Sequence, residues 1–219
     1  NRDEIIGDWD TYYEFGHLKS KESHKEDKVL LIQFWLPDST QTVKDGNGTY
    51  KTYYNSGYVK EFFTYKEGVP NGDFYENSPL GKPVIKGKYA NGFKEGEWNF
   101  WFRNGIHSKK CFYAEDKLNG AYIKWYEKDL VQVEGSYKNG KKDGYWKWFT
   151  TEGKLDMEGG FIDDLQDGLW KFYYANGSRA YQGEFDSGNK SGDWIYWYKT
   201  GEKHRAGKFK NNEKTGCGS

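Results

Sequence analysis

The chain has 219 residues, and its 33 lysines and arginines balance 33 aspartates and glutamates, so the formal net charge is zero. This balance disfavours a nucleic-acid partner, because proteins that bind duplexes normally carry a basic excess. A mean hydropathy of −1.06 alone would suggest disorder, but aromatic residues make up 20% of the chain. We therefore expect a folded chain held together largely by rings. No apolar run reaches the roughly 18 residues that a membrane span needs, so we expect no transmembrane segment.

Segment 1–47 is the least regular part of the chain. Gly7, with Trp9 and Gly16 after it, begins a copy of a pattern that recurs later, but about 17 residues are inserted before the next copy. The insertion contains a charged run from 19 to 28, for which we expect a solvated loop. The apolar run 29–36 should form a strand or cap, because repeat arrays need capped ends. We predict that 1–47 is a divergent first repeat that acts as an N-terminal cap.

A period of 24 residues governs the rest of the chain. Such self-similarity is the signature of a repeat architecture, and we predict seven tandem repeats over 48–215. Residues 216–219 then begin a further repeat that the chain does not complete, or are a tag. The period is set by one glycine per repeat, here called the anchor, from which other positions are counted. The anchors are Gly48, Gly72, Gly96, Gly120, Gly144, Gly168 and Gly192, and Gly216 continues the series.

Four further columns of the repeat keep one residue type. An aromatic residue stands two positions after every anchor and another stands seventeen positions after it, as Trp170 and Phe185 illustrate. Glycine stands nine positions after six anchors, with Asp129 as the substitute, and fifteen positions after five anchors, with Phe63 and Cys111 as the exceptions. This mixture of rings and glycines is typical of short strands joined by tight turns.

The Asn-Gly dipeptides at 104–105 and 176–177 predict two-residue hairpin loops, in which both turn positions have φ > 0. Such a loop places the residue two after the anchor opposite the residue fifteen after it, so Trp170 should face Gly183. Glycine inside a strand is otherwise unfavourable, and we expect it to give the indole room across the neighbouring backbone. The expected pairs are Trp98 with Cys111, Trp146 with Gly159, Trp170 with Gly183, and Trp194 with Gly207.

A second turn, marked by Asn-Gly at 91–92 and 139–140, returns the chain so that Tyr89 should meet Trp98 on one face of the sheet. Residues five after the anchor should point to the opposite face, because strand side chains alternate. We therefore predict an all-β fold, an elongated single-layer antiparallel β-meander of tandem 24-residue hairpin repeats. Because long twisted sheets do not remain flat, it should be twisted and curled into a trough.

Two segments resemble the MORN-variant repeat of YwqK-type bacterial antitoxin proteins: Gly96-Glu97-Trp98-x-x-Trp101-Phe102-x-Asn104-Gly105 and Tyr137-x-Asn139-Gly140-x-x-x-Gly144-Tyr145-Trp146. The resemblance covers 48–215 and, with an interruption, the segment from Gly7. It implies a binding scaffold for proteins and, in some MORN-type arrays, for lipids. The antitoxin label implies pairing with a toxin, but it carries no residue motif that could be transferred to this chain.

The sequence contains no recognisable catalytic or metal-binding motif. Its four histidines are scattered, and neither a His-Glu-x-x-His nor a Cys-x-x-Cys pair occurs, so zinc has no ligand set. Cys111 and Cys217 lie more than four repeats apart in the sequence, which is too far for a disulfide, so we expect two free thiols. We expect no cofactor, no metal and no catalytic residue, and hence no enzyme.

The candidate interaction site is a row of aromatic residues five positions after the anchor. These rings either cover the second face of the sheet or form a partly exposed ladder with a polar surround. An exposed ladder would suit a protein interface, where aromatic residues are enriched, and flat rings also stack on the faces of sugars. The residues of the row are Tyr53, Trp101, Trp125, Tyr173 and Trp197.

The leading hypothesis is a non-catalytic repeat scaffold that binds another protein, with a cognate toxin as the partner that the resemblance implies. The alternative is a cell-envelope glycan binder that uses the aromatic ladder. Membrane-surface binding would need a basic stripe, which the charge balance does not provide. An unpaired last strand could promote edge-to-edge dimers. The chain shows no export signal after Asn1, which fits a bacterial cytoplasm or, if a signal was removed, the cell envelope or the exterior.

Overall fold

The computed structural model describes residues 6–25 and 28–217, which form twenty β-strands. This described part contains no helix that could cross a membrane. The first ten strands are β1 (Gly7–Tyr12), β2 (Leu18–Lys25), β3 (Lys28–Trp35), β4 (Gln41–Lys44), β5 (Asn47–Tyr53), β6 (Val59–Lys66), β7 (Val69–Asn77), β8 (Pro83–Ala90), β9 (Phe93–Trp101) and β10 (His107–Ala114). The others are β11 (Lys117–Trp125), β12 (Val131–Lys138), β13 (Lys141–Lys142), β14 (Gly144–Phe149), β15 (Leu155–Ile162), β16 (Leu165–Tyr173), β17 (Arg179–Asp186), β18 (Asn189–Trp197), β19 (Lys203–Lys210) and β20 (Glu213–Cys217).

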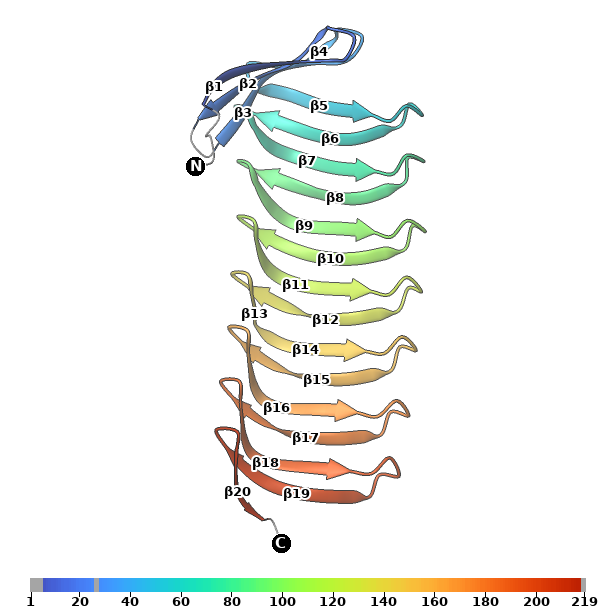
Figure 1. Ribbon diagram of the computed structural model, residues 1–219, viewed down its shortest axis with the longest axis vertical. Helices are drawn as coiled ribbons and strands as arrows, with labels where there is room; N and C mark the ends of the chain where they lie inside the picture. The colour runs from blue at the N-terminus through green and yellow to red at the C-terminus, as the bar shows by residue number, and fades with distance from the viewer. Residues whose placement is uncertain (1–5, 26–27, 218–219) are drawn as a thin grey trace. The chain divides into compact units, whose positions relative to one another are not determined.

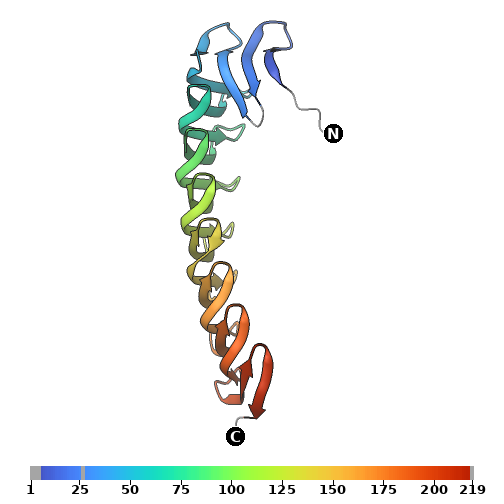
Figure 2. The same cartoon turned by 90° about the vertical axis from the view of Figure 1, so that its left-hand side faces the viewer.

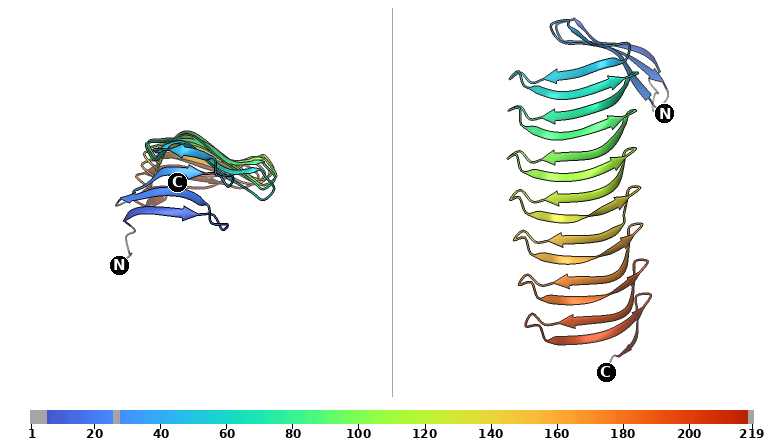
Figure 3. Two further views of the ribbon diagram at one scale, coloured as in Figure 1. Left: turned by 90° about the horizontal axis from the view of Figure 1, so that it is seen from above. Right: turned by 180° about the vertical axis from the view of Figure 1, so that it is seen from behind.

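The chain divides into two compact units: unit 1 comprises residues 1–105 and 113–116, and unit 2 comprises residues 106–112 and 117–219. Within each unit the strands pair antiparallel with their neighbours in the sequence, from β1 and β2 to β8 and β9 in unit 1 and from β11 and β12 to β19 and β20 in unit 2 (Figure 1). The same order can be followed from behind in Figure 3. The predicted all-β antiparallel meander of hairpin repeats is confirmed.

The N-terminal strands differ from the prediction in one respect. The solvated loop predicted for the charged run is wrong, because residues 18–25 form β2, which pairs with β1 on one side and β3 on the other. Two partners satisfy the backbone of β2 while most of its polar side chains remain half-exposed. The apolar run forms β3, as predicted, and its Leu31 and Phe34 pack with Val43 of β4 in a small core.

The first turn of each repeat also differs from the prediction. At 174–178 the amide of Tyr174 donates to the carbonyl of Ser178 at 2.8 Å, and the amide of Gly177 donates to the carbonyl of Tyr174 at 2.8 Å. Gly177 has φ +88°, whereas Asn176 does not have a positive φ. These features define a three-residue loop that ends in a glycine bulge, so the predicted two-residue loop is wrong.

The predicted register is nevertheless correct, because a bulge on the returning strand compensates for the longer loop. Tyr173 pairs with Arg179 and Phe172 pairs with Tyr181, so one residue of β17 is passed over. Beyond this point Trp170 pairs with Gly183, as predicted. The residue nine after the anchor has a left-handed φ, which explains why this position favours glycine.

The second turn is the one that has two residues with positive φ. Asn139 and Gly140 have φ +51° and +85°, and Asp163 and Asp164 have φ +49° and +71°. Both positions of a type I′ turn need such values, and this turn matches the twist of the two strands that it joins. The second turn therefore holds the tight hairpin that the prediction placed at the first.

A wide bulge lies at the anchors Gly72, Gly96, Gly168 and Gly192. Glu158 of β15 pairs with Lys171, and Gly160 pairs with Asp167, so the single residue Gly159 lies opposite the three residues 168–170 of β16. Extra residues on one strand bend a sheet locally. Figure 2 shows that the strands within each unit curve strongly rather than lie flat.

The bulge decides where the indole rings lie, and here the predicted ring and glycine pairs need a correction. The register pairs Trp146 with Gly159 and Trp170 with Gly183. The ring of Trp170, however, covers Gly159 of the preceding strand: a Cβ at Gly159 would lie 2.2 Å from Cδ2 of Trp170. Its Nε1 donates to the carbonyl of Gly160 at 3.0 Å. The three-residue side of the bulge lifts the indole over the earlier glycine, so the glycine that makes room stands eleven residues before the tryptophan.

The same relationship holds for the other three indoles, which cover glycines in the same column. Where that column lacks glycine, the later ring is smaller: Phe63 precedes Phe74 and Cys111 precedes Tyr122. This covariation is visible in the sequence and identifies the correct offset. Trp98 covers Gly87, Trp146 covers Gly135, Trp170 covers Gly159 and Trp194 covers Gly183. Gly207 is the register partner of Trp194.

Candidate interaction surface

The two faces of the sheet are unequal in each unit. We call the face that carries Trp98 in unit 1 and Trp146, Trp170 and Trp194 in unit 2 the indole face. Each of these four side chains is only 1% exposed. Neighbouring rings close around them, as Tyr137 does edge-on against Trp146 at 5.1 Å. This face is occupied by its own packing, so its indoles serve the fold.

Lysines two residues before alternate anchors complete the indole face. The ammonium of Lys142 lies 5.2 Å from the ring centroid of Trp146 and 4.9 Å from that of Phe161. Lys94 and Lys190 stand over Trp98 and Trp194 in the same manner, at 4.9 and 4.3 Å. Cation–π attraction of this kind stabilises a ring at an exposed site by about 0.5–1 kcal/mol.

Tyrosines six after the anchor also have a structural role. The hydroxyl of Tyr54 donates to the carbonyl of Asn77 at 2.9 Å, and that of Tyr174 donates to the carbonyl of Trp197 at 2.8 Å. Tyr126 does the same to Phe149 at 2.9 Å. In each case the acceptor lies 23 residues later, so these hydroxyls tie one repeat to the next.

The opposite face, here called the ladder face, carries the residues three and fourteen after each anchor, which pair from strand to strand. In unit 2 the middle of this ladder is ionic. Lys147 pairs with Glu134 on one side and Glu158 on the other, and Glu158 pairs next with Lys171. The ammonium and carboxylate atoms are 3.2 Å apart for Lys147 and Glu134 and 3.6 Å apart for Lys171 and Glu158.

Glu158 is the most buried charge of this ladder, at 9% exposure. Burial alone would raise its pKa, but a hydrogen bond from the hydroxyl of Tyr173 at 2.7 Å and the charge of Lys171 lower the pKa below its ordinary value. Burial and the same hydrogen bond raise the pKa of Tyr173 to about 12. The cluster keeps Glu158 ionised and Tyr173 neutral, which suits a structural ion pair.

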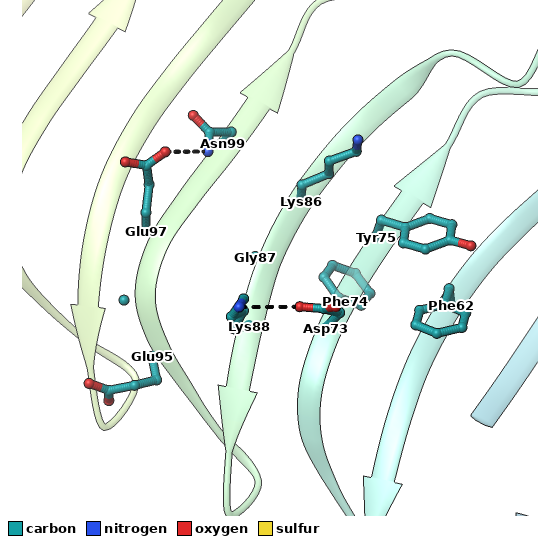
Figure 4. A pocket seen from close by; sticks show the side chains of 11 residues that line it. Phe62, Asp73, Phe74, Tyr75, Lys86, Gly87, Lys88, Glu95, Glu97 and Asn99 are labelled. Carbon is teal, nitrogen blue, oxygen red and sulfur yellow. Dashed lines mark hydrogen bonds and ion pairs between the residues drawn. The ribbon is translucent and has the colours of Figure 1, made fainter. Parts of the chain in front are cut away.

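In unit 1 the same ladder contains one aromatic pair. Phe62 and Tyr75 pair across β6 and β7, and their rings stack with centroids 4.7 Å apart and planes inclined by 6°. Lys51 lies over the other side of Phe62 at 5.5 Å. Beside this stack runs a groove of about 580 Å³ (Figure 4). Its lining includes Phe62, Asp73, Tyr75, Lys86, Lys88 and Asn99.

The predicted row lies at the first-turn end of the ladder face. Tyr53 is 44% exposed, whereas the four other members are half-buried. In unit 2 three members contact residues of the preceding repeat: Trp125 lies 5.7 Å from the ring of His107, Trp197 lies 5.6 Å from the guanidinium of Arg179, and Tyr173 bonds Glu158. The row is therefore partly engaged in joining repeats, and Tyr53 is its most exposed ring.

An exposed apolar patch on the ladder face of unit 2 was not predicted. Its four members lie on the successive strands β14, β15 and β16, and Ile162 pairs directly with Leu165. The residue type at these column positions varies between repeats, from Phe93 to Lys141 at the position of Leu165, so no constant column marks the four residues in the sequence. We call them the apolar patch: Tyr145, Ile162, Leu165 and Leu169 are exposed by 49, 57, 49 and 42%.

No catalytic arrangement was recognised in the described part of the chain. Within residues 6–25 and 28–217 no group of three or more histidine, cysteine, aspartate or glutamate side chains could hold a metal ion. Cys111 is buried and is not part of a disulfide, while the side chain of Cys217 lies outside the described ones. Three surfaces of the described part are taken as candidates for function: the groove of unit 1, the apolar patch of unit 2 and Tyr53.

The repeated hairpin, with one face closed by rings and the other presenting a ladder, defines a β-hairpin repeat protein. Residues 166–187 match the model of the MORN repeat variant, so the repeat is of MORN type. The comparison with curated proteins found no match.

Two solved structures are similar to this chain. The crystal structure of TcdB2-TccC3-Cdc42 shares 10% identity, with 87% of this chain and 13% of that chain covered and a TM-score of 0.24. The crystal structure of TcdB2-TccC3 shares 10% identity over the same fractions, with a TM-score of 0.25. The chain thus spans about an eighth of the length of those chains.

Proposed function

We propose that this protein is a non-catalytic scaffold that binds another protein through the apolar patch on the ladder face of unit 2. The observation that carries the proposal is the exposure of Tyr145, Ile162, Leu165 and Leu169 on three successive strands, on the face opposite the buried indoles. Exposed apolar side chains on neighbouring strands, bordered by charged groups, are typical of protein interfaces. The ionic ladder that ends at Lys171 supplies such a rim.

The MORN-type repeat supports this proposal, because repeat arrays present extended surfaces to their partners. The resemblance to YwqK-type antitoxins adds the class of partner, a toxin protein. In this proposal the neutral overall charge leaves nucleic acid outside the range of partners. Edge-to-edge dimers through an unpaired strand are a further mode of association that the sheet permits.

The experiment is affinity capture from the native cell extract, followed by titration of the purified partner. Leu165→Asp/Leu169→Asp should weaken binding at least about tenfold, because charges would enter a desolvated interface. The matched control is Leu80→Asp, which changes an apolar residue of unit 1 that is 74% exposed. Equal binding by the double variant and the wild type would contradict the proposal. Trp101→Ala/Trp125→Ala tests in the same assay whether the predicted row contributes.

A further inference from the structure

The repeats provide internal controls for the ladder position of Phe62 and Tyr75. Equivalent cross-strand pairs are Lys86 with Asn99, Glu134 with Lys147, Glu158 with Lys171, and Gln182 with Ile195. The fold is thus built equally well with polar, ionic or mixed pairs at this place. The hairpin does not need an aromatic pair at this half-exposed position. The pair is therefore a candidate for contact with a ligand.

The stack turns one ring face toward the groove. Phe62 covers Tyr75 from the side of β6, so the other face of Tyr75 is directed toward β8, where Lys86 is its cross-strand neighbour. Figure 4 shows the two rings side by side, with Lys86 and Gly87 on the next strand. The volume of about 580 Å³ falls in the usual range of small-molecule sites. The corresponding groove in unit 2 measures about 380 Å³, and its cross-strand ladder positions hold Ile123, Glu134 and Lys147 in place of aromatic residues.

The charged side chains that line the groove are of both signs, three carboxylates and two ammonium groups. The ammonium of Lys88 lies 3.5 Å from the carboxylate of Asp73, and the amide of Asn99 donates to Glu97 at 2.9 Å. Lys86 adds a donor, and Glu95 adds an acceptor. Because groups of both signs line the groove, it carries no strong field of one sign that would favour a polyanion or a polycation. It offers both donors and acceptors to an uncharged ligand.

A ring face next to paired donors and acceptors matches the chemistry of a pyranose. One side of a sugar ring presents C–H groups, which are attracted to the negative face of an aromatic ring, and its rim presents hydroxyls that both donate and accept. We propose that the groove of unit 1 binds a neutral saccharide, with one pyranose on Tyr75 and its hydroxyls bonded to Asp73, Lys86 and Asn99. This inference goes beyond the proposed protein scaffold and involves a different unit.

Calorimetric titration of the full chain with four neutral hexasaccharides tests the proposal: cellohexaose, laminarihexaose, maltohexaose and the hexamer of N-acetylglucosamine. At least one should bind, and Tyr75→Ala should weaken that binding about tenfold because the stacking surface is lost. Tyr75→Phe should remain close to the wild type, since it keeps the ring. Lys147→Ala, the variant at the corresponding ladder position of unit 2, should bind like the wild type.

The variants should fold, because lysine, asparagine and isoleucine occupy the position of Tyr75 in other repeats, and a far-ultraviolet spectrum checks this. Absence of binding by all four sugars would overturn the proposal, as would equal affinity of Tyr75→Ala and the wild type. A protein partner lost with Tyr75→Ala, with no sugar bound, would assign the groove to protein recognition instead. Loss of the patch interaction with Leu165→Asp/Leu169→Asp would leave the sugar result unchanged, so the two proposals fail separately.

Discussion

Trp170 lies on Gly159, with which it does not pair, and pairs with Gly183, which it does not cover. The ring occupies the space above a strand glycine eleven residues earlier, and its Nε1 bonds the next carbonyl of that strand. Ring and glycine therefore form one structural unit that joins successive repeats.

Gly159→Ala should lower the free energy of unfolding by about 1–3 kcal/mol, because the new methyl group would overlap a fully buried indole. Urea unfolding followed by tryptophan fluorescence measures the change. The double variant Gly159→Cys/Trp170→Tyr reproduces the natural combination of Cys111 and Tyr122, so its loss should be smaller than the sum of the two single losses. Additive losses would show that ring and glycine are not coupled.

Asp129→Gly should raise the free energy of unfolding by about 1 kcal/mol. Asp129 has φ +60° at the bulge position where the six other repeats have glycine, and a side chain is unfavourable in that conformation. Gly153→Ala, at the same position of the next repeat with φ +76°, should change the stability in the opposite direction by a similar amount. A neutral or destabilising effect of Asp129→Gly in urea unfolding would contradict this explanation.

Lys142→Met should lower the free energy of unfolding by about 0.5–1 kcal/mol, because the apolar stem remains while the cation above Trp146 and Phe161 is lost. Lys141→Met is the control, since Lys141 is exposed and precedes Lys142 in the same short strand. Thermal unfolding of the two variants side by side gives the comparison. Equal midpoints of thermal unfolding for the two variants would show that the ammonium of Lys142 does not stabilise the indole face.

Glu158→Gln should destabilise the protein near neutral pH and much less in acid. The folded pKa of Glu158 is lowered, so its ionised form contributes stability above the unfolded value of about 4.3 and loses it as the pH falls below that value. Urea unfolding of variant and wild type at about pH 7 and about pH 3 should therefore show a difference that shrinks in acid. A constant difference would mean that the charge of Glu158 is unimportant.

Tyr173 makes the stability of the folded protein depend on pH in the alkaline range, where stability falls as the pH rises. Its pKa is raised to about 12 in the folded protein, so its neutral form contributes stability below the ordinary value of about 10 and loses it between about 10 and 12. Tyr173→Phe should lack this loss. If the free energies of unfolding of the wild type and Tyr173→Phe fell in parallel over this range, the loss could not be assigned to ionisation of Tyr173.

The period, the antiparallel hairpins and the register that places Trp170 opposite Gly183 could be predicted from the sequence. The reason is that glycines and aromatic residues recur there at fixed spacing. The sequence also contained, in the covariation of Cys111 with Tyr122 and of Phe63 with Phe74, the information that the ring belongs to the earlier glycine.

Only the tertiary structure decided which strand each indole covers and which surfaces stay open. At a wide bulge three residues of one strand lie opposite a single residue of its neighbour. A prediction that assumes regular pairing of the strands cannot anticipate this displacement. The ladder of Phe62 and Tyr75 and the apolar patch around Leu165 vary in residue type from repeat to repeat. Their positions follow from the pairing of strands, and their exposure follows from the burial of the opposite face, so no periodic column could reveal them.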